Sequence, residues 1–154
     1  MKKIVVMAML LLGLLVSTSF SDGSKGYSLI PDCSVSLATV KKDIAASYKQ
    51  TKALLAAGKD MERLRSPFTP SCMDGMHYNK PRVEPLIEKL DSLPKVEAVH
   101  RLAVASINLR VCTTCSSGAF EWCDMAEKEL ERAKSSMKDI HSDFRYIKQE
   151  FCSK

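Results

Sequence analysis

The chain has 154 residues and a formal net charge of +5, with 23 Lys and Arg against 18 Asp and Glu. This mild charge is spread over segments of mixed sign, and no basic stripe with interleaved aromatic residues occurs, so we do not expect nucleic acid as a partner. The length suits one domain with a hydrophobic core of its own and is too short for two.

The first 21 residues have the features of a signal peptide. Lys2 and Lys3 precede an apolar run, 4–16. Ser19 and Ser21 then supply small residues at positions −3 and −1 of a cleavage site. The apolar run is shorter than the roughly 20 residues that a transmembrane helix needs. We therefore expect cleavage after residue 21, export to the periplasm or out of the cell, and no membrane span afterwards.

The mature chain is predicted to begin with an extended arm, 22–33, which is rich in Ser, Gly and Lys. A disulfide-stabilised helical bundle, 34–154, follows. Apolar residues at helical spacing predict a first helix over 34–65, which must end before Pro67. Two prolines and a glycine within 66–80 predict a long irregular connection.

Helical spacing resumes over 82–115, where Pro94 is expected to kink or split the segment. From 119 to 152, small or apolar residues recur at alternating spacings of four and three, a heptad seam that predicts one long helix packed along its length. The seam positions are Ala119, Cys123, Ala126, Leu130, Ala133, Met137, Ile140, Phe144, Ile147 and Phe151.

The three helical spans have nearly equal lengths, which predicts an all-α, antiparallel up-down-up bundle of three long helices. If Pro94 splits the middle span, the result is a four-helix bundle.

Six cysteines lie beyond the signal peptide, and an even number in a small exported domain predicts three disulfides. An up-down-up bundle would leave only Cys72 and Cys152 at one end and the other four cysteines at the opposite end. Because bridged Cα atoms lie within about 7 Å of each other, the predicted bridges are Cys72–Cys152, Cys112–Cys123 and Cys33–Cys115. The alternative at the crowded end is Cys112–Cys115 with Cys33–Cys123.

That alternative bears on function, because Cys112 and Cys115 have the C-x-x-C spacing of thiol–disulfide oxidoreductases. Catalytic motifs of this kind lie at a helix N-terminus, where the helix dipole lowers a thiol pKa. Here the motif falls at a predicted helix C-terminus, where the dipole has the opposite effect. Structural disulfides are therefore the preferred interpretation, and redox activity is kept as an alternative.

The seam changes character along the last helix, from small residues in its first half to large ones in its second half. We expect the bundle to be tight at the four-cysteine end and wider at the other. An apolar cleft is predicted there, closed by the 66–80 connection and lined by Phe68, Met76, Tyr78, Met137, Ile140, Phe144, Ile147 and Phe151.

No nucleophile motif, phosphate-binding loop or carboxylate pair stands out, so we predict neither enzymatic activity nor a cofactor. No metal site is predicted. Met73, Met76 and His77 come nearest to one, since thioether and imidazole suit Cu(I), but Cys72 is expected to be used in a bridge, which leaves only three donors.

The sequence therefore favours an exported, non-enzymatic binding protein that acts through a protein partner, as an inhibitor, immunity or adaptor protein does. One alternative is a carrier of a small apolar ligand or a soft metal ion. A second is a redox protein that uses Cys112 and Cys115.

Overall fold

A computed structural model of the chain describes residues 33–63, 69–116 and 118–153, and this part is all helical, as predicted. Its helices are α2 (Leu37–Arg63), α3 (Pro70–Ser92), α4 (Glu97–Cys112), α5 (Ala119–Ser136), the 3-10 turn η1 (Met137–Asp139) and α6 (Ile140–Cys152). Within these ranges no helix is long and apolar enough to cross a membrane. The predicted signal peptide, the arm up to residue 32 and Phe68 lie outside the described residues.

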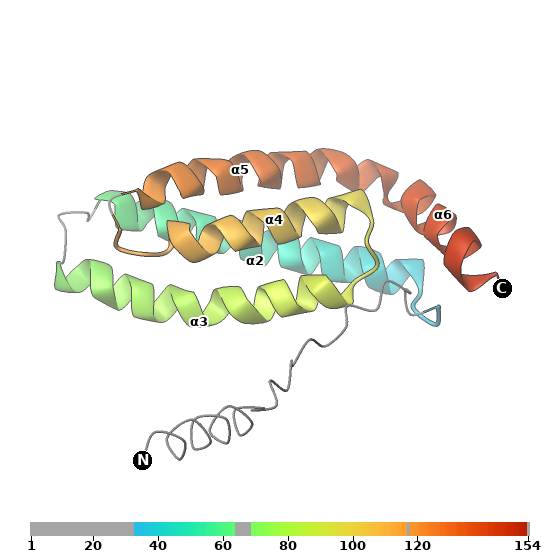
Figure 1. Ribbon diagram of the computed structural model, residues 1–154, viewed down its shortest axis with the longest axis horizontal. Helices are drawn as coiled ribbons and strands as arrows, with labels where there is room; N and C mark the ends of the chain where they lie inside the picture. The colour runs from blue at the N-terminus through green and yellow to red at the C-terminus, as the bar shows by residue number, and fades with distance from the viewer. Residues whose placement is uncertain (1–32, 64–68, 117, 154) are drawn as a thin grey trace, which may run out of the picture.

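Helices α2, α3, α4 and α5 lie side by side, roughly parallel to one common axis, and each runs opposite to the one before it (Figure 1). The prediction that 82–115 forms one span of a three-helix bundle is therefore wrong, and the four-helix alternative is the arrangement found. The chain reverses at Leu93–Val96, because Pro94 cannot continue the helix and Leu93 and Val96 adopt extended backbone angles on either side of it.

The prediction of an irregular connection over 66–80 is also wrong, because α3 already begins at Pro70. Proline is well suited to the first turn of a helix, where its missing N–H has no intrahelical partner. Two further prolines, Pro81 and Pro85, lie inside α3 on its exposed side. The carbonyl groups that they leave without a helical hydrogen bond can therefore be hydrated, so α3 continues through both.

The core is built from aliphatic side chains of all four long helices, with α4 in the middle. The fully buried members include Ile44 of α2, Leu86 and Leu90 of α3, and Leu102 and Leu109 of α4. Helix α4 has buried residues over about half of its circumference, because α2, α3 and α5 all pack against it. Alanines on α4 and α5 let these two helices approach closely, namely Ala98, Ala105, Ala119, Ala126 and Ala133.

Helix α2 continues through Gly58, which is a point of close contact rather than an interruption. A Cβ atom at this position would overlap Cys112 Sγ. The absence of a side chain thus lets α2 lie directly against the end of α4.

The three disulfides are Cys33–Cys152, Cys72–Cys115 and Cys112–Cys123. The third is as predicted, whereas Cys33–Cys115 and Cys72–Cys152 are wrong. The error follows from the number of passes along the bundle. Because α3 and α4 are separate antiparallel helices, the start of α3 lies beside the end of α4, and the C-terminus returns to the end where α2 begins.

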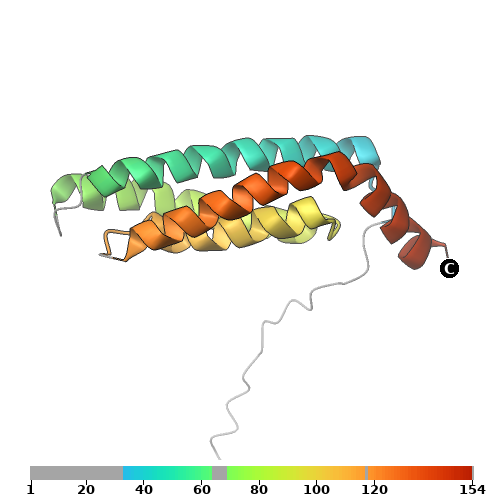
Figure 2. The same cartoon turned by 90° about the horizontal axis from the view of Figure 1, so that it is seen from above.

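The predicted last helix, 119–152, is interrupted by the 3-10 turn η1, beyond which α6 turns away from the bundle axis (Figure 2). Only Ile140 and Phe144 of α6 are buried. The far end of α6 is held by the Cys33–Cys152 bridge and by Lys148 Nζ, which donates a hydrogen bond to the carbonyl of Cys33 at 2.7 Å.

Candidate functional site

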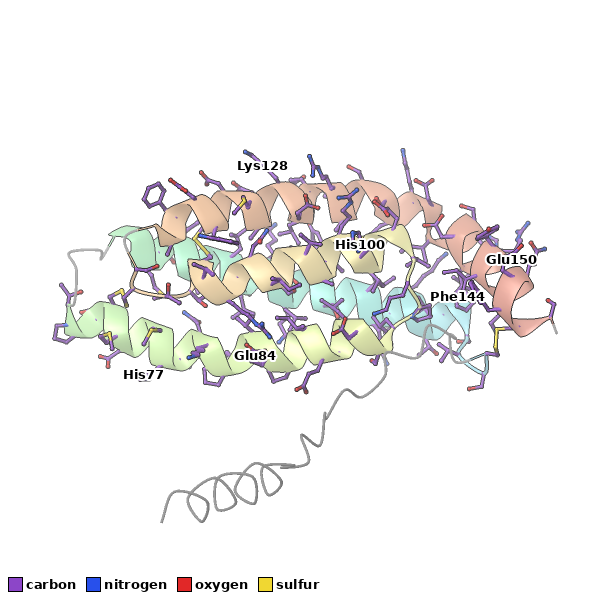
Figure 3. All side chains as sticks on the ribbon, viewed as in Figure 1. His77, Glu84, His100, Lys128, Phe144 and Glu150 are labelled. Atoms are coloured by element: carbon purple, nitrogen blue, oxygen red, sulfur yellow. A yellow bond between two sulfur atoms is a disulfide. The ribbon has the colours of Figure 1, made fainter. Side chains whose placement is uncertain are left out.

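The predicted apolar cleft is not assembled. Met76 and Tyr78 lie near the start of α3, whereas the predicted residues from Met137 onward lie at the opposite end of the bundle. Figure 3 shows this separation directly, with His77 near one end of the molecule and Phe144 near the other. Tyr78 is 61% exposed and stacks on the guanidinium of Arg82, with 3.8 Å between Cζ and the ring centroid. These residues would meet only in a bundle of three passes, whereas the chain makes four with α2, α3, α4 and α5.

Large apolar side chains are instead exposed on the hairpin formed by α4 and α5. Ile107 of α4 is 47% exposed, and Trp122 and Met125 of α5 are 37% and 39% exposed. Trp122 and Met125 are three residues apart, so they share one side of α5.

The Cys112–Cys123 bridge places these residues on the same side of the hairpin. Val111 and Trp122 each directly precede a bridged cysteine, and in antiparallel helices that position turns toward the same side of the pair. Ile107 lies one turn before Val111, and Val104 a further three residues back, both facing that side. We call the resulting surface the α4–α5 patch; its members are Val104, Ile107, Val111, Trp122 and Met125.

Charged residues border the patch at its α6 end and fix the register of the hairpin. Arg101 of α4 hydrogen-bonds to Glu97 at 2.7 Å and to Glu129 of α5 at 3.2 Å, and Glu129 also pairs with Arg132. The hydrogen bonds that the Arg101 guanidinium donates to the carboxylates of Glu97 and, second, Glu129 raise the pKa of Arg101. The guanidinium therefore stays charged at every physiological pH.

Two open depressions continue from this charged border toward α6. The first, about 440 Å³, is lined by Glu97, Arg101, Glu131, Arg132, Ser135 and Ser136. The second, about 450 Å³, is lined by Lys95, Val96, Glu97, Ser142, Asp143, Tyr146 and Ile147. Glu97 belongs to both, so the two depressions adjoin each other, and the first begins where the patch ends.

Exposed Trp and Met beside charged residues form the kind of surface that protein interfaces use. Aromatic residues, Met and Arg are enriched at interfaces, and Trp and Arg are frequent hot spots. The hairpin that presents them is fixed by the Cys112–Cys123 disulfide and by the Arg101–Glu129 ion pair between its helices, so binding would require little ordering of the backbone.

The C-x-x-C motif is divided between two bridges, since Cys112 pairs with Cys123 and Cys115 with Cys72. The alternative pairing Cys112–Cys115 is therefore contradicted. Cys112 is also fully buried. A redox reaction at this motif would first require both of these bridges to be opened.

The candidate metal donors Met73, Met76 and His77 lie on the first two turns of α3 rather than in a flexible loop. Both methionines are partly buried and His77 is exposed. Across the described residues, no three side chains of His, Cys, Asp or Glu converge to form a hard or mixed-donor metal site.

Reading the sequence by its periodic seam missed Trp122 and Met125. Each lies directly beside a seam position, Cys123 or Ala126, and so falls on the outer side of the helix. The available signal was the occurrence of large apolar residues, Phe120, Trp122 and Met125, off the buried stripe of a helix whose other off-stripe residues are mostly charged. Comparisons of the chain with protein-family models, with curated proteins and with solved structures find no match.

Proposed function

We propose that this chain is an exported binding protein that recognises a protein partner through the α4–α5 patch. The observation that carries the proposal is the exposure of Ile107, Trp122 and Met125 together on one outer side of a disulfide-fixed hairpin. Three disulfides and the lack of a membrane-crossing helix in the described part are compatible with export.

The dimensions of the hairpin suit a helical or extended partner segment. Helices of 16 and 18 residues are about 24 and 27 Å long, and two packed helices present a face roughly 20 Å wide. This face is somewhat smaller than the roughly 800 Å² per partner of a standard interface. We therefore expect the partner to extend beyond the patch and over the charged border at Arg101 and Arg132.

Site-specific photo-crosslinking tests this proposal, because it reports whether a partner lies on the patch inside the cell. A photoreactive amino acid is placed at Met125 in the full chain, and at the exposed Lys49 of α2 in a control variant. Both are expressed in the native producing cell with export intact. We expect a discrete cross-linked product from position 125, none from position 49, and its loss when Trp122→Ala is added.

Equal products from both positions, or a product at 125 that Trp122→Ala leaves unchanged, would overturn the proposal. Trp122 is partly exposed and lies outside the core, so its replacement should leave the fold intact, which circular dichroism would verify. Loss of the product can then be assigned to the surface rather than to unfolding.

A further inference from the structure

We propose that α3 carries a surface site for a soft monovalent metal ion, Cu(I) or its analogue Ag(I), with Met73, Met76 and His77 as ligands. This site is at the Cys72–Cys115 end of α3 and is independent of the α4–α5 patch. It is a second binding function, and it does not rest on the function proposed above.

The helical conformation of this segment brings the three donors together. Met73, Met76 and His77 have the spacing i, i+3, i+4, which places them on one face of α3 within little more than one turn. Cβ atoms at these spacings are about 5–6 Å apart. Methionine has three rotatable side-chain bonds, so both thioethers and the imidazole can reach a common ion above the helix surface.

The segment that carries the donors is firmly held. Cys72, directly before Met73, is buried and bridged to Cys115 beyond the end of α4. Gly75, between the two methionines, lets Met61 of α2 pack closely, since a Cβ there would lie 3.1 Å from Met61 Cγ. The buried Met61 sulfur already accepts a hydrogen bond from Asn79 Nδ2 at 3.5 Å, so we do not count it as a ligand.

The donor chemistry selects the metal. All six cysteines are bridged, so no thiolate among the described residues competes for a soft ion. Two thioethers and one imidazole provide soft and borderline donors without a carboxylate, a set that suits Cu(I) and offers little to Zn²⁺ or Ca²⁺. Lys80 lies one turn further along the same face, but its exposed ammonium can remain in solvent.

A second Met–His pair in the chain provides an internal contrast. Met137 and His141 are also four residues apart, but the 3-10 turn η1 begins at Met137 and changes the helical spacing. Arg145 Nη2 lies 3.3 Å from His141 Nε2, so a guanidinium cation already occupies the space beside that imidazole. Only two donors are present there, and we expect no tight site.

Silver titration of the full chain with its disulfides intact tests the site. Ag(I) is added in chloride-free buffer and followed by native mass spectrometry and calorimetry, and Cu(I) affinity is measured by competition with a coloured Cu(I) chelator. We expect one Ag(I) per chain, affinity at least tenfold lower in Met73→Leu/Met76→Leu, and a clear loss in His77→Gln. Leu conserves the volume of Met, so the fold should be retained.

The matched control is Met137→Leu/His141→Gln, which removes one thioether and one imidazole elsewhere and should leave the affinity unchanged. The inference is overturned if the control loses as much affinity as Met73→Leu/Met76→Leu, or if no Ag(I) binds more tightly than it binds free methionine. Neither result affects the crosslinking test at Met125, so the two proposals can fail separately.

Discussion

Gly58 offers the sharpest test of the packing between α2 and the α4–α5 hairpin. Replacing a helical glycine by alanine usually stabilises a protein, but at Gly58 we expect it to destabilise. In the interior of a helix, Gly→Ala normally stabilises the protein by about 1 kcal/mol, since alanine has the higher helix propensity. At Gly58, however, the added Cβ would overlap Cys112 Sγ, and that sulfur belongs to a buried disulfide. It cannot move aside as the end of a flexible side chain can.

Forcing an extra methyl group into a well-packed core typically costs about 1–3 kcal/mol. After subtraction of the propensity gain, we expect Gly58→Ala to lower the free energy of unfolding by about 1 kcal/mol, with an upper limit near 2. Gly75→Ala is the matched control, because its Cβ would meet the flexible side chain of Met61 at 3.1–3.2 Å. We expect that variant to be neutral or slightly stabilised.

Urea unfolding followed by far-ultraviolet circular dichroism would measure both variants under oxidising conditions. The comparison should be repeated in a Cys112→Ala/Cys123→Ala background, where the bridge itself is worth about 3 kcal/mol by loop-closure entropy. There the obstructing sulfur is absent, so Gly58→Ala should no longer destabilise. If Gly58→Ala is as stable as the parent protein while the bridge is intact, the contact between α2 and Cys112 is refuted.

Two further predictions concern α6 and α3. Non-reducing peptide mapping should link Cys33 to Cys152. Because α6 buries only two of its residues, Cys33→Ala/Cys152→Ala should speed amide hydrogen exchange in α6 while α2–α5 stay protected. Unchanged exchange in α6 would show that the bridge does not hold this helix in place. Pro81→Ala/Pro85→Ala should raise the free energy of unfolding by about 2 kcal/mol or more, since each proline removes one helical hydrogen bond from α3 and interior proline costs roughly 3 kcal/mol relative to alanine. A less stable variant in urea unfolding would contradict a continuous α3.

Periodicity predicted those elements whose apolar residues face a neighbouring helix. The seam positions from Ala119 to Ala133 are buried in α5, and α2 covers Leu37–Arg63 of the predicted span 34–65, of which 64 and 65 lie outside the described residues. Prolines were less informative, since four of them lie in and around α3 with different effects. Pro70 begins the helix, Pro81 and Pro85 are accommodated on its exposed side, and only Pro94 ends a helical run.

The cysteine pairing illustrates how one topological error spreads. A bridge requires neighbouring Cα atoms, so the end of the bundle at which a cysteine lies limits its possible partners. The predicted pairing depends on whether the chain makes three or four passes along the bundle. An extra pass moves every later cysteine to the opposite end. Only Cys112–Cys123 was insensitive to this, because its two cysteines lie 11 residues apart across one short turn.

The same dependence on the number of passes explains why the predicted apolar cleft is not found. A heptad seam reports which residues are buried between helices, so it identifies surface that packing has already used. Past Ala133 the chain bends through η1, and beyond this bend only Ile140 and Phe144 of α6 are buried. What remains for a partner or a metal is the set of residues outside the seam. Trp122 and Met125 on α5, and Met73, Met76 and His77 on α3, are such residues. In this chain, function is therefore best sought among the apolar and metal-binding side chains that helix packing does not bury.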